Sequence, residues 1–142
     1  MPSRVRPTPT ILVVEADADI RAITAEVLRD AGYRAVAAPT RAAAHTALRA
    51  VRFALVLSGT LGRGRPPHEH WRALEALRDA AGATPVVIFT AHTPARFADH
   101  AARGFAGLVP KPFDVDELLA VVRAALGDAV PRVEALEPCA RA

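Results

Sequence analysis

The chain has 142 residues, of which 51% are hydrophobic, and this length supports one domain with a full core. No apolar run approaches the ~20 residues of a membrane-spanning helix, and the N-terminus lacks the apolar stretch of a secretory signal, so we expect a cytoplasmic protein. The single cysteine, Cys139, excludes an internal disulfide, which fits a reducing compartment. The 18 basic residues exceed the 15 acidic ones, but they are scattered along the chain, which indicates a basic surface rather than a nucleic-acid-binding footprint.

Apolar runs alternate with helical patterns in chain order. The strands are expected at 10–14, 33–38, 53–58, 84–91 and 105–110. The helices are expected at 17–32, 40–52, 68–80, 93–104 and 114–127. Thr40 and Asp114 are in N-cap positions, while Gly32 and Gly104 follow helix ends.

This alternation predicts an α/β fold, a doubly wound parallel sheet of five strands flanked by five helices. The predicted domain spans 10–127, between a disordered N-terminal tail at 1–9 and a C-terminal tail at 128–142. In such sheets the functional crevice lies at the carboxyl ends of the strands. The residues at or just past these ends are Glu15, Ala16 and Asp17, then Ser58, Gly59 and Thr60, then Thr90 and Ala91, and finally Lys111 and Pro112.

Four stretches of the sequence carry a resemblance to a known family. They are "ILVVEADADIRAITAEVLRDAGY", "FALVLSGTLG", "TPVVIFTA" and "GFAGLVPKPFDVDELL". The chain resembles the response-regulator receiver domain of two-component signalling over about 11–127. The "KPF" after the last strand and the "TA" after the fourth are the most specific matches. The resemblance implies a flavodoxin-like fold with strand order 2-1-3-4-5.

Receivers of this family carry two acidic residues after the first strand and a phosphoacceptor aspartate after the third. A hydroxyl residue follows the fourth strand and a lysine follows the fifth. The carboxylates hold Mg²⁺, a cation that requires oxygen ligands, and the metal and the lysine neutralise charge as a phosphoryl group reaches the aspartate.

This chain matches only part of that set. Glu15 stands at the first acidic position and Ala16 at the second, where the direct metal ligand belongs. Gly59 stands at the phosphoacceptor position and has no side chain to phosphorylate. We therefore predict a pseudo-receiver without phosphorylation chemistry, with Mg²⁺ binding weak or absent and no cofactor.

The remaining positions of the site keep the switch hydroxyl and the lysine, as Thr90 and Lys111. Leu108 stands where many relatives have the switch aromatic residue. We expect Lys111 to pair with Glu15 across the vacated site, since unit charges ~4 Å apart attract by ~4 kcal/mol at an effective dielectric of about 20, before desolvation.

Several other residues near the predicted site are expected to have ordinary structural roles. Asp17 is expected to cap the first helix, Ser58 to face away from Gly59, and Thr60 has no carboxylate for an acyl phosphate. The side chains of His68 and His70 are two residues apart, which does not place two ligands on one helix face. The stretch "GRGRPPHEH" contains arginines, but we expect it to be an ordinary flexible loop and not an anion-binding site. We expect Trp71 to have a packing role and not to bind a ligand.

The predicted function is a stand-alone, non-enzymatic interaction module of two-component signalling. Its expected partner is a protein, either a histidine kinase, a phosphotransfer protein or another regulator. A homodimer through the face of segments 93–104, 105–110 and 114–127 is a further possibility, and no membrane or nucleic acid is expected. The alternatives are phosphorylation at an unexpected residue, or sensing of a small ligand in the vacated crevice.

Overall fold

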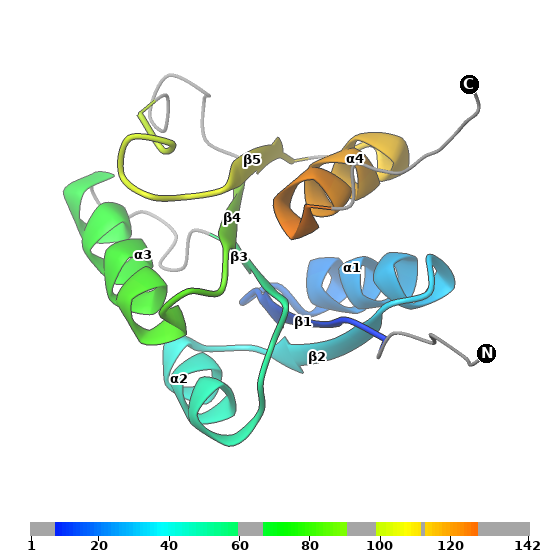
Figure 1. Ribbon diagram of the computed structural model, residues 1–142, viewed down its shortest axis with the longest axis horizontal. Helices are drawn as coiled ribbons and strands as arrows, with labels where there is room; N and C mark the ends of the chain where they lie inside the picture. Colours follow the sequence, from blue (N-terminus) through cyan, green and yellow to red (C-terminus); the bar gives the residue numbers. More distant parts are fainter. Residues whose placement is uncertain (1–7, 60–66, 91–98, 112, 128–142) are drawn as a thin grey trace.

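A computed structural model describes residues 8–59, 67–90, 99–111 and 113–127, and it contains a five-stranded parallel sheet (Figure 1). The strands are β1 (Thr10–Val14), β2 (Arg34–Ala38), β3 (Leu55–Gly59), β4 (Val86–Thr90) and β5 (Gly107–Pro110). Their order across the sheet is β2-β1-β3-β4-β5, which confirms the predicted order. All four neighbouring pairs are parallel, so the carboxyl ends of the strands meet at one edge.

Four helices cover the two faces of this sheet. They are α1 (Ala18–Asp30), α2 (Arg41–Ala50), α3 (Pro67–Ala81) and α4 (Val115–Leu126). Helices α1 and α4 lie on one face, and α2 and α3 lie on the other (Figure 1). The doubly wound α/β architecture predicted from the sequence is therefore confirmed.

The core is divided between these two faces because successive side chains of a strand point in opposite directions. Ile11 and Val13 of β1 pack in the cluster that includes Leu118 of α4, whereas Leu12 and Val14 pack in the cluster that includes Leu74 of α3. The three central strands are buried along most of their length, as parallel strands covered by helices on both sides require.

Capping residues fix where the helices begin and end. Thr40 is the N-cap of α2 and accepts a hydrogen bond from the Ala43 amide, and Asp114 is the N-cap of α4. Gly127 ends α4 with a φ of 75°, in the left-handed region that glycine adopts without strain. Both N-caps were predicted from the sequence.

The prediction of five helices differs from the four in the described part of the chain. The helix expected at 93–104 falls partly on 91–98, which lie outside the described residues. Its expected carboxyl end, at 99–104, forms turns, with the Arg103 amide donating to the Asp99 carbonyl and Gly104 at a φ of 91°. The predicted tails also lie largely outside the described residues. No helix in the described part of the chain combines the length and apolar character needed to cross a bilayer.

Candidate functional site

The carboxyl edge of the sheet brings Glu15, Gly59 and Lys111 together. Val14 of β1 lies in register with Ser58 of β3, so Glu15, one residue past β1, lies beside Gly59. The Lys111 amide donates to the Thr90 carbonyl over 2.8 Å, which extends the β4–β5 pairing to the site. Three segments far apart in the sequence therefore meet where the fold predicts a functional crevice.

Glu15 and Lys111 form a buried ion pair. The Lys111 Nζ lies 2.5 Å from Glu15 Oε1, and the side chains are only 14% and 6% exposed. The second carboxylate oxygen, Oε2, accepts a hydrogen bond from the Asp17 amide at 3.0 Å. The pairing expected from the sequence is confirmed, and each oxygen of the Glu15 carboxylate has a donor.

Aromatic contacts help to place the lysine. The Lys111 Nζ lies 4.8 Å from the centroid of the Phe89 ring, within the range of a cation–π interaction. Phe89 in turn packs edge-on against Phe113, with ring centroids 5.4 Å apart. The ammonium group is thus held between a carboxylate and a ring that is itself fixed in the core.

Gly59 is adjacent to the Glu15 carboxylate. A Cβ atom at position 59 would lie 2.6 Å from Glu15 Oε1 and 3.3 Å from its carboxyl carbon. Both distances are shorter than ordinary van der Waals contact, and the first requires one of the two groups to move. The space in which a side chain at position 59 would begin is therefore filled by Glu15.

The loop between β1 and α1 is held by an arginine that the sequence analysis missed. Arg21 Nη1 donates to the Glu15 carbonyl at 2.9 Å and to the Ala16 carbonyl at 3.3 Å. The Asp17 carboxylate accepts from the amides of Asp19 and Ile20, so it caps α1 as predicted. Ala16 is exposed on this loop and contributes no polar side chain.

The comparisons with known proteins agree with this geometry. The family model of the response regulator receiver domain matches residues 11–123. This chain belongs to that family. No curated protein is significantly similar to it.

Solved structures of receivers share its fold. The chemotaxis response regulator CheY4 of Vibrio cholerae superposes with a TM-score of 0.72 at 24% identity, over 84% of this chain and 99% of CheY4. A response regulator from Thermotoga maritima gives a TM-score of 0.74 at 23% identity, over 86% of this chain and 100% of the other. NtrX from Brucella abortus, solved in complex with ADP, gives 0.75 at 27% identity, over 85% of this chain but 27% of NtrX.

The residues at this receiver site do not fit the Mg²⁺ ion that the family implies. Mg²⁺ needs near-octahedral oxygen ligands, but Ala16 and Gly59 supply no side-chain oxygen. Both carboxylate oxygens of Glu15 already accept hydrogen bonds, and the Asp17 carboxylate caps a helix. Among the residues that the structure describes, no group of three His, Cys, Asp or Glu side chains is placed to hold a metal.

The two positions that the resemblance assigns to the switch differ in burial. Thr90 is buried at the end of β4, and Leu108 of β5 is in register with Ile88 and packs against the α2–α3 core cluster. No aromatic ring stands at position 108 to move with the hydroxyl. Ser58 is buried, and its hydroxyl donates to the Gly59 carbonyl at 2.9 Å.

The other candidates contribute packing. Trp71 is buried against Phe105, with ring centroids 5.6 Å apart, which confirms its predicted packing role. His70 is fully buried on α3. Thr60 and the arginines of the "GRGRPPHEH" loop lie outside the described residues.

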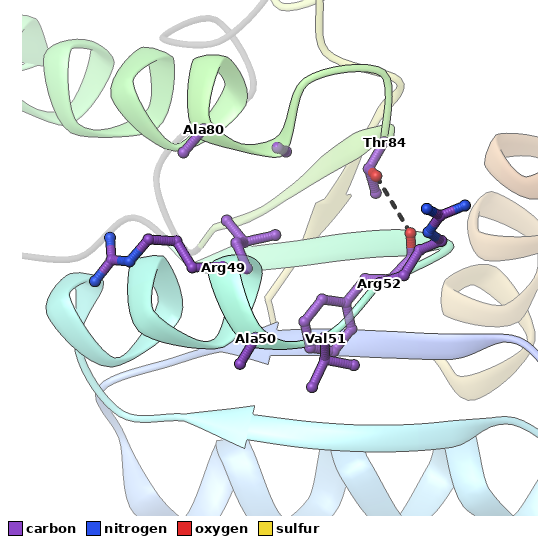
Figure 2. Close-up of a pocket in the computed structure, with 9 residues that line it drawn as sticks. Arg49, Ala50, Val51, Arg52, Ala80 and Thr84 are labelled. Carbon is purple, nitrogen blue, oxygen red and sulfur yellow. Dashed lines mark hydrogen bonds between the residues drawn. The ribbon is translucent and has the colours of Figure 1, made fainter.

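A separate hollow of about 370 Å³ lies at the opposite, amino edge of the sheet (Figure 2). It is lined by the ends of α2 and α3 and by Thr84, whose hydroxyl donates to the Phe53 carbonyl at 3.2 Å. The side chains of Arg49 and Arg52 point away from each other, so they do not converge on one ligand (Figure 2). This hollow contains none of the receiver site residues.

Proposed function

We propose that this receiver domain acts in two-component signalling without being phosphorylated, by binding another protein. One observation carries the proposal: the Glu15 carboxylate stands where a side chain at position 59 would begin, 2.6 Å from its Cβ position. The phosphoacceptor position therefore lacks a carboxylate, and the Glu15 carboxylate would have to move before a side chain could stand there.

Two further features support this proposal. Lys111, the residue that would stabilise an incoming phosphoryl group, has its charge balanced by Glu15 at 2.5 Å. In the part of the site that the structure describes, Ala16 and Gly59 offer no side-chain oxygen to Mg²⁺, and phosphoryl transfer depends on a metal to neutralise the developing charge. Both halves of the transfer chemistry are affected, so we infer a non-enzymatic protein. Membership of the receiver family supports our proposal that it works in the cytoplasm.

Binding to a protein partner is the activity that we propose for this domain. A histidine kinase, a phosphotransfer protein or another response regulator fits the family to which the chain belongs. We place the contact, or a homodimer interface, on the face of segment 93–104, β5 and α4. Its described part includes Val115, which is 46% exposed at the start of α4.

Intact-mass measurement tests the proposal. The protein is incubated with Mg²⁺ and acetyl phosphate, alongside a receiver known to accept phosphate from this donor. We expect no phosphoryl mass on this chain while the control receiver gains one. A phosphoadduct, stable or labile, would overturn the proposal, and peptide mapping would then locate the acceptor.

A further inference from the structure

We propose that the crevice above Gly59 is a binding site for one carboxylate group, and that Glu15 occupies it from within the chain. This inference deepens the proposed function and rests on it in one respect, namely that the crevice is used by an internal anion and not by a phosphoryl group. The ligand class is a small carboxylate, of the size of acetate.

The donors of the site match a single carboxylate. The Lys111 Nζ donates to one oxygen at 2.5 Å, and the Asp17 amide donates to the other at 3.0 Å. One donor is charged and the other belongs to the backbone at the start of α1, so the two hold a planar anion at both of its oxygens. The Phe89 ring, 4.8 Å from Nζ, positions the ammonium group independently of Glu15.

The space beside Gly59 also matches the size of a single carboxylate group. Position 59 is a buried glycine, and the nearest atom to its missing Cβ is Glu15 Oε1. The Glu15 side chain is 6% exposed, so the carboxylate is enclosed by the protein. Replacing Glu15 with alanine removes a CH₂–COO⁻ group, and acetate supplies the same atoms.

Acetate rescue of the Glu15→Ala variant tests this inference. The full chain is unfolded by heat at neutral pH in increasing sodium acetate, with sodium chloride at equal concentration as the control. We expect acetate to raise the Tm of Glu15→Ala in a saturable manner, because a ligand that binds the folded state stabilises it. Benzoate, which is larger than the vacated space, is expected to give only the chloride effect.

Glu15→Gln is the matched control variant. It removes the charge but leaves the crevice filled, so we expect a lower Tm than that of the wild type and no specific response to acetate. The wild type is likewise expected to respond equally to acetate and chloride. Equal effects of acetate and chloride on Glu15→Ala would overturn the inference, as would equal rescue of Glu15→Gln.

A second pair of variants tests the same site if Glu15→Ala does not fold. We expect Gly59→Ala to lower the Tm more in the wild type than in a Glu15→Asp background, because aspartate is shorter by one methylene and withdraws from position 59. An equal loss in both backgrounds would show that Glu15 does not fill the crevice. A phosphoadduct would contradict the proposed function and leave these results unaffected, so the two failures are distinguishable.

Discussion

Lys111 forms the buried ion pair at the centre of this receiver site. Its ammonium group lies 2.5 Å from Glu15, and both side chains are largely withdrawn from water. Removing one partner of such a pair leaves a buried charge without compensation, which costs far more than the pair itself contributes. The lysine is therefore expected to be needed for the stability of the domain even without phosphoryl chemistry.

We expect Lys111→Met to lower the free energy of unfolding by about 3–5 kcal/mol, the usual cost of breaking a buried ion pair on one side. Urea unfolding followed by circular dichroism measures this change. Arg123→Met, on the exposed side of α4, is the matched control and should have little effect. The double variant Glu15→Gln/Lys111→Met should recover part of the loss, and an unchanged stability of Lys111→Met would refute the structural role.

The sequence predicted this pair but not the contacts around it. Glu15 and Lys111 carry opposite charges at the same edge of the sheet, and burial makes their pairing necessary. The contact between Glu15 and Gly59 depends on which rotamer the long Glu15 side chain adopts, and no sequence pattern encodes that choice. Arg21 was missed for a similar reason, because its side chain reaches back across five and six residues to loop carbonyls.

At the scale of elements, local chemistry predicted most of the fold. The run at 10–14 is β1 without change, and the hydroxyl of Thr40 begins α2 as expected. The strand expected at 53–58 is observed at Leu55–Gly59, because its start depends on pairing with β1 and not on its own sequence. Only residues 99–104 of the helix expected at 93–104 are described, and they form turns.

The edge of the sheet at β2 is protected by a side chain. Arg29 of α1 donates to the Ala35 carbonyl over 2.8 Å, which occupies a backbone acceptor on β2. Edge strands with free acceptors pair with other chains. We expect Arg29→Ala to increase self-association, measured by light scattering during incubation below the Tm. Arg123→Ala, which removes the same charge elsewhere, is the control, and equal association of both variants would exclude the protective role.

The turns at 99–104 are held against α3 by Arg103. Its guanidinium lies 4.1 Å from the centroid of the Trp71 ring and donates to Glu75 at 3.2 Å and to Asp99 at 2.8 Å. We expect Arg103→Ala to speed amide hydrogen exchange in residues 99–105 while that of β1 is unchanged. Uniform acceleration across both segments, or no acceleration, would contradict a local anchoring role.

The same contact has a pH dependence. The hydrogen bond from Arg103 lowers the pKa of the Asp99 carboxyl below its ordinary value of 3.8. A carboxyl whose pKa is lowered by folding contributes stability above its unfolded pKa, and loses it as the pH falls through the folded value. Protection of residues 99–105 in wild type should therefore decline only in acid, below pH 3.8.

On the scale of the whole molecule, the chain has the fold of the receiver family but different residues at two positions of its site, Ala16 and Gly59. The parallel strand order places the ends of β1, β3 and β5 at one edge, where the resemblance to receivers implies the Mg²⁺ and phosphoryl site. Here the same edge holds an internal carboxylate on Lys111 and an arginine on the β1–α1 loop. Charged groups of the chain itself therefore pair with one another at this edge.

We expect Mg²⁺ to leave the Tm of the full chain unchanged relative to a sodium chloride control of equal ionic strength. A cation that binds the folded state would raise the Tm progressively with its concentration. Differential scanning fluorimetry over increasing MgCl₂ measures this directly. A saturable rise specific to Mg²⁺ would show that the site assembles a metal-binding set that its described side chains do not provide.

The most direct test of the Glu15–Lys111 pair uses the fact that Lys111 is the single lysine of the chain. Selective ¹⁵N labelling of lysine side chains gives one ammonium signal by NMR, with no assignment needed. We predict a slowly exchanging signal that shifts in Glu15→Gln and is unaffected by Mg²⁺ in the wild type. A rapidly exchanging, solvent-like signal that ignores Glu15→Gln would contradict the central claim that Glu15 occupies this crevice.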